Sequence, residues 1–283
     1  MHNKNVQPTN RKHAMINAIW GITTAPFQRE KLTLLSQQKT VFDIIKIHAQ
    51  QGGFSVIIGE PGVGKTVLRE HIEQLNNERE CTVVSCSRTL HTYRQIIWQL
   101  AESFKLETTE KNIEKDLIDT AFAQVRERKT VYILIDEAHL LELLTLRKLR
   151  LLFERFPKNH NLVLFGQPEL MYYLSLNTNK DIKSRITYSA SIKPLKDDDI
   201  ERFIVKELEA AKMGINTFDE GALSLIIRSG EGNLRLCRNL CLASLIEAAR
   251  ETKKTVTITH VNNVLVQPHW RSHEELIKQQ VAW

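Results

Sequence analysis

Residues 59–66 read Gly-Glu-Pro-Gly-Val-Gly-Lys-Thr and fit the phosphate-binding pattern G-x-x-x-x-G-K-[ST]. An apolar run at 54–58 precedes this loop and a helical pattern follows from near Lys65, so we expect the loop between a strand and a helix. The glycines let the backbone curl until its N–H groups and the helix N-terminus point at phosphate oxygens. We therefore expect Lys65 to hold the β- and γ-phosphates of ATP and the Thr66 hydroxyl to bind Mg²⁺. The residues expected to contact nucleotide here are Gly59, Glu60, Pro61, Gly62, Val63, Gly64, Lys65, Thr66 and Val67.

Two carboxylates follow a second apolar run. Residues 131–135 (Val-Tyr-Ile-Leu-Ile) lead directly into Asp136 and Glu137. In a parallel sheet this position is the carboxyl edge, beside the phosphate loop. We expect Asp136 to order Mg²⁺ through its water shell and Glu137 to act as general base for the water that attacks the γ-phosphate. The alternative for either acid is a cap for the helix expected after Ala138.

The middle of the chain alternates short β-branched runs with longer amphipathic segments, which predicts a parallel sheet wrapped by helices. The expected strands are 54–58, 82–85, 131–135 and 162–165, and the expected helices are 32–49, 92–104, 113–126 and 144–156. After Pro194 the pattern turns helical, with helices expected at 197–211, 219–229 and 234–252. We predict a flexible basic N-terminal arm (1–13), an α/β nucleotide-binding core (14–194), a small all-helical lid (195–267) and a C-terminal tail (268–283).

Composition narrows the function classes. Of 283 residues, 42% are hydrophobic and 25% charged, which excludes a mostly disordered chain. The 39 Lys and Arg outnumber 33 Asp and Glu, giving a formal charge of +6, which favours an anionic partner such as nucleic acid or, equally, a solvated basic surface. The four cysteines form no pair of CxxC motifs, the start does not resemble a signal peptide, and no apolar run approaches the ~20 residues of a membrane span. We therefore expect a cytoplasmic protein.

With these motifs the chain resembles AAA+ ATPases, and among them the bacterial group that includes ExeA, TniB, MuB and TnsC. The resemblance covers roughly residues 16–266. The stretches that carry it are Trp20-Gly21-Ile22, Pro26-Phe27, Gly59 to Thr66, Leu134 to His139, Gly166 to Leu170, and Gly232 to Arg235. It implies an AAA+ P-loop NTPase fold with a helical lid, and the cofactors ATP and Mg²⁺.

The resemblance also implies roles for residues outside the two motifs. Gln167 matches the sensor of the γ-phosphate, although the wider family usually has Asn, Ser or Thr there and a simple turn is the alternative. Arg235 matches the second sensor, which reaches from the lid to the nucleotide of its own subunit; the alternative is a surface arginine at a helix start. Arg185 matches the arginine finger that enters a neighbour's site, and Lys183 is its rival for that role.

For function, the resemblance implies a transposition regulator. Such a protein forms a ring or helical filament, binds the backbone of double-stranded DNA without sequence preference, and recruits a transposase, with a target-selection protein as a further partner. Arg88 and Arg94, in the segment after the second strand, are the candidate DNA contacts, and a solvated helix face is their alternative.

Three other functions are weighed against transposition. An ExeA-like ATPase of secretion-system assembly shares the same core, but its relatives typically continue into a membrane span and a periplasmic part, for which we expect no room here. A nucleotide-gated scaffold with negligible turnover is disfavoured by Glu137. A replication initiator or helicase loader commonly appends a winged helix, and only about fifteen residues follow Pro268.

Overall fold

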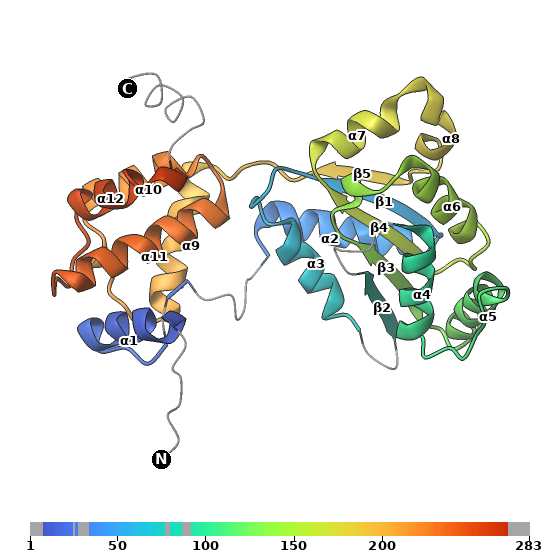
Figure 1. The fold of residues 1–283 in the computed structure, drawn as a ribbon, viewed down its shortest axis with the longest axis horizontal. Coiled ribbons are helices and arrows are strands. Elements are labelled where there is room, and N and C mark those ends of the chain that lie inside the picture. Colours follow the sequence, from blue (N-terminus) through green and yellow to red (C-terminus); the bar gives the residue numbers. More distant parts are fainter. Residues whose placement is uncertain (1–7, 25, 28–33, 77–79, 87–91, 271–283) are drawn as a thin grey trace, which may run out of the picture. The chain divides into compact units, whose positions relative to one another are not determined.

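Five parallel strands form the central sheet, in the order β2-β3-β4-β1-β5 (Figure 1). The computed structural model describes residues 8–24, 26–27, 34–76, 80–86 and 92–270, with side chains from residue 14 onward. The strands are β1 (Gly53–Ile58), β2 (Cys81–Cys86), β3 (Thr130–Ile135), β4 (His160–Gly166) and β5 (Tyr188–Ser191). β1, β3 and β4 are apolar along most of their length and almost completely buried, as expected for parallel strands covered on both faces. The predicted parallel sheet wrapped by helices is confirmed.

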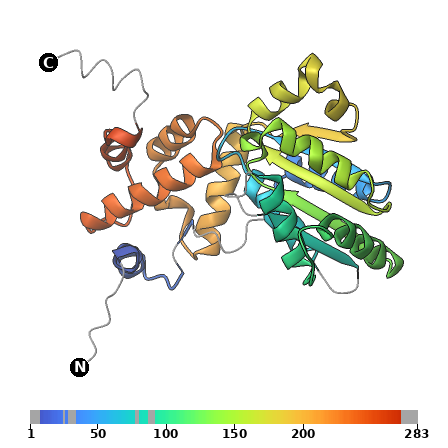
Figure 2. The same ribbon diagram turned by 45° about the vertical axis from the view of Figure 1, so that its right-hand side comes forward.

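Helices cover both faces of this sheet and create two apolar cores. α2 (Ser36–Ala49) and α3 (Lys65–Glu73) pack on one face, where Ile57 and Phe165 are fully buried. The other face carries α4 (Tyr93–Ser103), α5 (Ile113–Arg126), α6 (Leu143–Phe153) and α7 (Pro168–Ser175). Figure 2 shows the green helices α4 to α6 lying over this second face. The remaining elements of the unit are the short helices η1 (Ala138–Leu140), η2 (Asn177–Asn179) and α8 (Lys180–Lys183).

The chain divides into two compact units, Leu32–Lys193 and a second unit that joins Met1–Lys31 to Pro194–Trp283. The second unit is helical. Its elements are α1 (Pro8–Trp20), α9 (Asp197–Ala210), η3 (Ile215–Thr217), α10 (Glu220–Gly230), α11 (Leu234–Arg250), α12 (Ile258–Leu265) and η4 (Pro268–Trp270). Among the described residues, none of the helices in either unit is long and apolar enough to cross a membrane.

The N-terminal segment differs from our prediction in two ways. Residues 8–13, expected as part of a flexible arm, are the start of helix α1, and residues 14–31, expected in the α/β core, group with the helical unit. From residue 14 onward, where side chains are described, Ile16 is fully buried and the Trp20 indole donates to the Lys254 carbonyl at 2.9 Å. The sequence of the first thirteen residues has no apolar period, so it gave no helical signal.

Candidate nucleotide-binding site

The loop of residues 59–64 lies where the motif requires, after β1 and before α3. Gly62 and Gly64 have φ angles of 89° and 104°, in the left-handed region that glycine adopts without strain. A Cβ on Gly59 would lie 2.7 Å from the Ile192 carbonyl oxygen and 2.9 Å from the Val63 side chain. The loop conformation therefore depends on glycine at all three positions, and the loop ends at the start of α3, where the first N–H groups of a helix have no partner within the helix.

Lys65, the first residue of α3, folds back over this loop. Its ammonium group donates to the carbonyl oxygens of Gly59 at 2.6 Å and Glu60 at 3.0 Å, and the residue is 92% buried, since only 8% of its surface is exposed. A buried ammonium group is stable only with such partners. The loop thus concentrates one full positive charge and the helix N-terminus at a single place, which suits an anionic phosphate chain.

Gln38 of α2 supports the loop from behind, a role that sequence reasoning missed. Its amide nitrogen donates to the Gly64 carbonyl at 3.2 Å and its amide oxygen accepts from the Leu35 backbone at 2.9 Å. Gln38 is only 2% exposed and shares the buried face of α2 with Val41 and Ile45. A polar residue on an otherwise apolar helix face was the one available signal.

The two carboxylates end β3 and have different surroundings. Asp136 is 7% exposed; one of its oxygens accepts from the Glu137 backbone at 2.9 Å and the other lies 3.5 Å from the Arg69 guanidinium. Arg69, on α3, also donates to Glu73 at 2.9 Å and to the Ser85 hydroxyl at 3.0 Å. Arg69 therefore ties the helix after the phosphate loop to the ends of β2 and β3, and sequence reasoning missed it.

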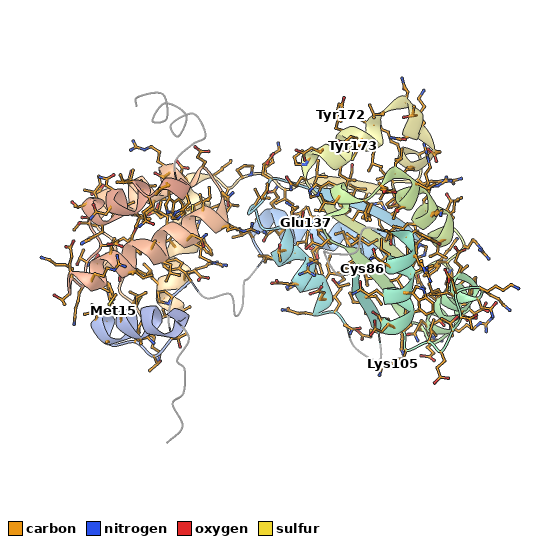
Figure 3. The ribbon with its side chains drawn as sticks, in the orientation of Figure 1. Met15, Cys86, Lys105, Glu137, Tyr172 and Tyr173 are labelled. Atoms are coloured by element: carbon orange, nitrogen blue, oxygen red, sulfur yellow. The ribbon has the colours of Figure 1, made fainter. Side chains whose placement is uncertain are left out.

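Glu137 and Gln167 are brought together through His139. Glu137 has φ 53°, and its carboxylate lies 3.5 Å from His139 Nδ1. The other ring nitrogen, Nε2, lies 3.0 Å from the amide nitrogen of Gln167, which caps the start of α7 directly after β4. Figure 3 labels Glu137 at this edge of the sheet. The candidate base and the candidate sensor thus share one intermediate side chain.

The donors at this edge fit Mg²⁺. Thr66 offers a hydroxyl and Asp136 a carboxylate, and Mg²⁺ is usually held by one or two such oxygens together with substrate phosphates. Within the described part of the chain, no group of three or more His, Cys, Asp or Glu residues could hold a metal by itself. Thr66 and Asp136 would hold the ion next to a bound triphosphate, where it would offset the phosphate charge.

Arg185 lies at the opposite edge of the sheet, the amino edge, where the strands begin. It stands between α8 and β5, two residues before Thr187, whose hydroxyl accepts from the Phe54 backbone at the start of β1 at 3.0 Å. The phosphate loop follows the far end of β1, roughly 17 Å away for a six-residue strand. Such a span exceeds the length of an arginine side chain, so Arg185 cannot reach the phosphate loop of its own subunit.

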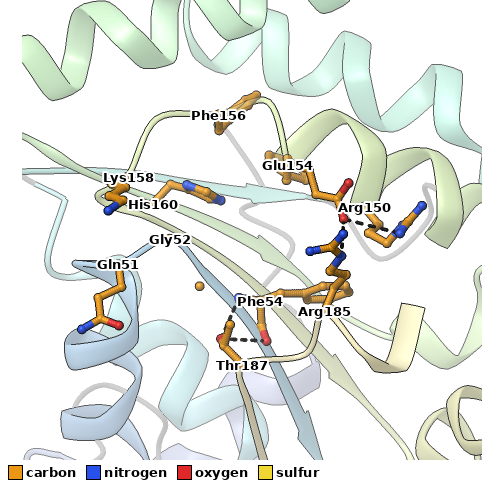
Figure 4. Close-up of a pocket in the computed structure, with 12 residues that line it drawn as sticks. Gln51, Gly52, Phe54, Arg150, Glu154, Phe156, Lys158, His160, Arg185 and Thr187 are labelled. Atoms are coloured by element: carbon orange, nitrogen blue, oxygen red, sulfur yellow. Dashed lines mark hydrogen bonds and ion pairs between the residues drawn. The ribbon is translucent and has the colours of Figure 1, made fainter. Parts of the chain in front are cut away.

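A cavity of about 320 Å³ lies at this second edge (Figure 4). Arg185 is 59% exposed and donates to Glu154 at 2.9 Å, while Arg150 approaches the same carboxylate at 3.4 Å. Lys158 and His160 also line the cavity. Burial lowers the pKa of His160, whose ring contacts the Pro157 carbonyl at 2.7 Å. This edge therefore presents two arginines on one carboxylate, and Lys158 lines the same cavity.

The remaining candidates stay predictions. Lys183 is exposed at the end of α8, and Arg235 is exposed on the first turn of α11, where Asn233 accepts the Arg235 N–H at 3.0 Å. Arg94 is 69% exposed and pairs with Glu110 at 2.9 Å. Arg88 lies outside the described residues.

The strand order, the phosphate loop and the acidic end of β3 together define a P-loop fold of the AAA+ type. Residues 47–174, which contain the loop and both carboxylates, match the family described as AAA domain. In solved structures, the chain superimposes on the Aeropyrum pernix ORC2 protein in its ADPNP-ADP complexes with a TM-score of 0.66, at 13% identity over 85% of this chain and 71% of that one. Drosophila ORC bound to DNA gives a TM-score of 0.68, at 16% identity over 97% of this chain and 71% of that one. At these identities the likeness concerns the fold.

A relative by sequence is the general secretion pathway protein A of Aeromonas hydrophila. The two chains are 32% identical over 214 residues, which cover 72% of this chain. The matched region spans 39% of the length of that relative.

Proposed function

We propose that this chain is a Mg²⁺-dependent ATPase that works as an oligomer, each active site being completed by an arginine of the neighbouring copy. The observation that carries this proposal is the division of charged groups between the two edges of the sheet. The carboxyl edge holds Lys65, Asp136 and Glu137, whereas Arg185 lies at the amino edge, out of reach of its own phosphate loop.

In this proposal the residues of the carboxyl edge divide the chemistry. The loop N–H groups and Lys65 bind the phosphates, and Thr66 and Asp136 hold Mg²⁺. Glu137 accepts a hydrogen bond from the water that attacks the γ-phosphate and takes its proton as general base. The products of ATP and water are then ADP and phosphate. Gln167 donates to the γ-phosphate, and Arg235 of the helical unit acts on the same nucleotide as a second sensor.

The trans-acting role is assigned to Arg185 rather than Lys183. Arg185 belongs to the charged cluster that lines the cavity, and a guanidinium group offers two parallel donors to a phosphate oxygen pair. In the single subunit Glu154 holds this group at 2.9 Å. In an assembly, the neighbour's phosphates would replace Glu154 as the partner of Arg185.

The ATPase proposal is tested with Glu137→Gln. The amide keeps the size of the side chain but cannot act as a base, so we expect turnover to fall by about 10²-fold or more while ATP affinity stays within about twofold. Steady-state phosphate release and binding of a fluorescent nucleotide measure the two quantities. Wild-type turnover in this variant would show that another group activates the water.

For the partner, we propose double-stranded DNA and a transposase, with ATP-dependent assembly on the DNA. The net charge of +6 supports an anionic partner, and Drosophila ORC, which shares the fold, was solved bound to DNA. Arg88 and Arg94 are the proposed contacts with the DNA backbone. Because phosphate contacts release counterions, binding should weaken steeply with salt.

A second candidate is supported by the sequence relative. The 32% identity to the general secretion pathway protein A favours an ATPase of secretion-system assembly, in which the same core drives a different partner. Duplex DNA separates the two candidates. A DNA-associated ATPase should bind duplex DNA in ATP, lose it between 50 and 200 mM salt by about 10³-fold or more, and bind it less well as Arg88→Ala with Arg94→Ala. Absence of binding at low salt would favour the secretion candidate.

A further inference from the structure

His139 lies between the carboxyl ends of two neighbouring strands, β3 and β4. It belongs to η1, which follows β3, yet one ring nitrogen contacts Gln167, which follows β4, 28 residues further along the chain. The other ring nitrogen faces Glu137 at 3.5 Å. The side chain is 12% exposed, so water has little access to either contact. A histidine at a helix start more often bonds to nearby backbone; here both neighbours are side chains of the proposed site.

For a neutral ring, the two contacts favour one tautomer of His139. The amide nitrogen of Gln167 can only donate, so Nε2 of His139 accepts and the ring proton lies on Nδ1. That proton points toward the Glu137 carboxylate. In a neutral ring, rotating the Gln167 amide would move the ring proton to Nε2 and set a lone pair of Nδ1 against the carboxylate, which is the less favourable arrangement. The donor direction therefore runs from Gln167 to His139 to Glu137.

The backbone brings these groups into reach. A Cβ on Gly166 would lie 3.4 Å from the His139 backbone nitrogen and 2.8 Å from the Leu170 side chain. Gly166 thus lies within van der Waals distance of η1, and its tighter contact is with Leu170 of α7. The Nδ1 to Glu137 distance of 3.5 Å is longer than a hydrogen bond, and Nδ1 is a buried atom without a hydrogen-bond partner. Catalytic hydrogen bonds are often long before substrate binds and shorten afterwards.

We infer that His139 is a positioning residue that links the phosphate sensor Gln167 to the base Glu137; this inference rests on the ATPase activity proposed above. The Gln167 amide carries two N–H groups, so it can donate to His139 and to a γ-phosphate oxygen together. Binding of the γ-phosphate would fix the amide, the amide would fix the ring, and Nδ1–H would close on Glu137. ADP lacks the γ-phosphate and would leave the carboxylate unaligned.

Substitution of His139 tests this link. We expect His139→Ala to lower kcat by about 10-fold to 100-fold with KM for ATP within about twofold, because misplacement of a catalytic group costs rate rather than binding. His139→Asn keeps a donor near Nδ1 and should recover part of the loss. Leu140→Ala, at the next and 53% exposed position of η1, is the matched control and should keep the wild-type kcat.

Double variants separate positioning from folding. If His139 acts through Glu137, adding His139→Ala to Glu137→Gln should cause no further loss of kcat, and adding it to Gln167→Ala should cost no more than the larger single loss. The inference would be overturned, and the ATPase proposal left standing, in either of two cases. One is that the losses of kcat in the single variants multiply in the double variants, and the other is that the kcat of His139→Ala lies within twofold of wild type. A fall in the thermal midpoint that accounts for the lost rate, without rescue by Asn, would also overturn it. Absence of wild-type turnover would reject the ATPase proposal and this inference together.

Discussion

The two edges of the central sheet differ in how firmly their charged groups are held. At the carboxyl edge, Lys65 and Asp136 are 8% and 7% exposed and fixed by several partners. At the amino edge, Arg185 is 59% exposed and is held by one carboxylate, Glu154. The difference teaches that one edge is built in advance by the fold of a single copy, whereas the other presents a cation whose partner can change.

This difference has an energetic basis. Buried charges need permanent partners, since losing one leaves an uncompensated charge at a cost of about 3–5 kcal/mol. Exposed ion pairs contribute only about 0.2–1 kcal/mol and exchange easily. Under our proposal, the first edge binds and positions ATP in every copy, and the second edge acts only when a neighbour offers phosphate.

Removing Arg185, the proposed arginine finger, should give the largest effect. We expect Arg185→Ala to lower turnover by about 10³-fold, because such an arginine stabilises charge in the transition state, while ATP binding at the other edge is unchanged. Lys183→Ala, two residues away, is the control and should stay within about twofold. Phosphate release measures both. Loss of activity in the lysine variant instead would transfer the role to Lys183.

Removing Lys65 at the carboxyl edge should instead weaken the binding of ATP. Lys65→Ala deletes the charge that faces the phosphates, so we expect ATP affinity to fall by about 100-fold. The exposed Lys46, on α2, supplies a control substitution that should leave affinity unchanged. Titration with a fluorescent ATP analogue gives the dissociation constants. Equal affinities for Lys65→Ala and wild type would remove the nucleotide site from this edge.

The two edges also differ in how many of their site residues could be predicted from the sequence. The phosphate loop and Asp136-Glu137 are contiguous stretches at strand ends, so local sequence placed them on β1 and β3 with boundaries correct to about one residue. Gln38 and Arg69 support the same edge through contacts with residues that are distant in sequence; the polar residue on the apolar face of α2 hints at Gln38 but does not identify its partner, and no local pattern identifies that of Arg69.

Several elements of the fold were not predicted, among them β5, α1, α7, α8 and α12, and the first two illustrate the physical reasons. β5 (Tyr188–Ser191) alternates half-buried residues with exposed serines, so it lacks the apolar run that marked the other strands. The helix α1 is held by contacts with α11 and the Lys254 carbonyl, which its first six residues do not reveal. The pairing of Arg185 with Glu154 likewise joins two elements and carries no sequence signal.

Releasing Arg185 from its ion pair with Glu154 should give the smallest effect. Glu154→Gln removes the charge that holds Arg185 and Arg150. Because Arg185 is 59% exposed, Glu154 is 34% exposed and the amide can still accept a hydrogen bond, we expect the free energy of unfolding to fall by only about 1 kcal/mol. Turnover at low protein concentration should rise or stay equal. Denaturant titration and phosphate release over a range of protein concentrations check both. A loss of turnover comparable to that of Arg185→Ala would mean that Glu154 itself belongs to the active site.

Mixing two inactive variants tests the central claim most directly. Glu137→Gln lacks the base but keeps Arg185, and Arg185→Ala lacks the finger but keeps Glu137. In a mixed assembly, the site formed by Glu137 of one copy and Arg185 of the other is complete, so we predict phosphate release well above the sum of the two separate variants. Release that stays equal to that sum, in mixtures shown by light scattering to assemble, would contradict an active site shared between copies.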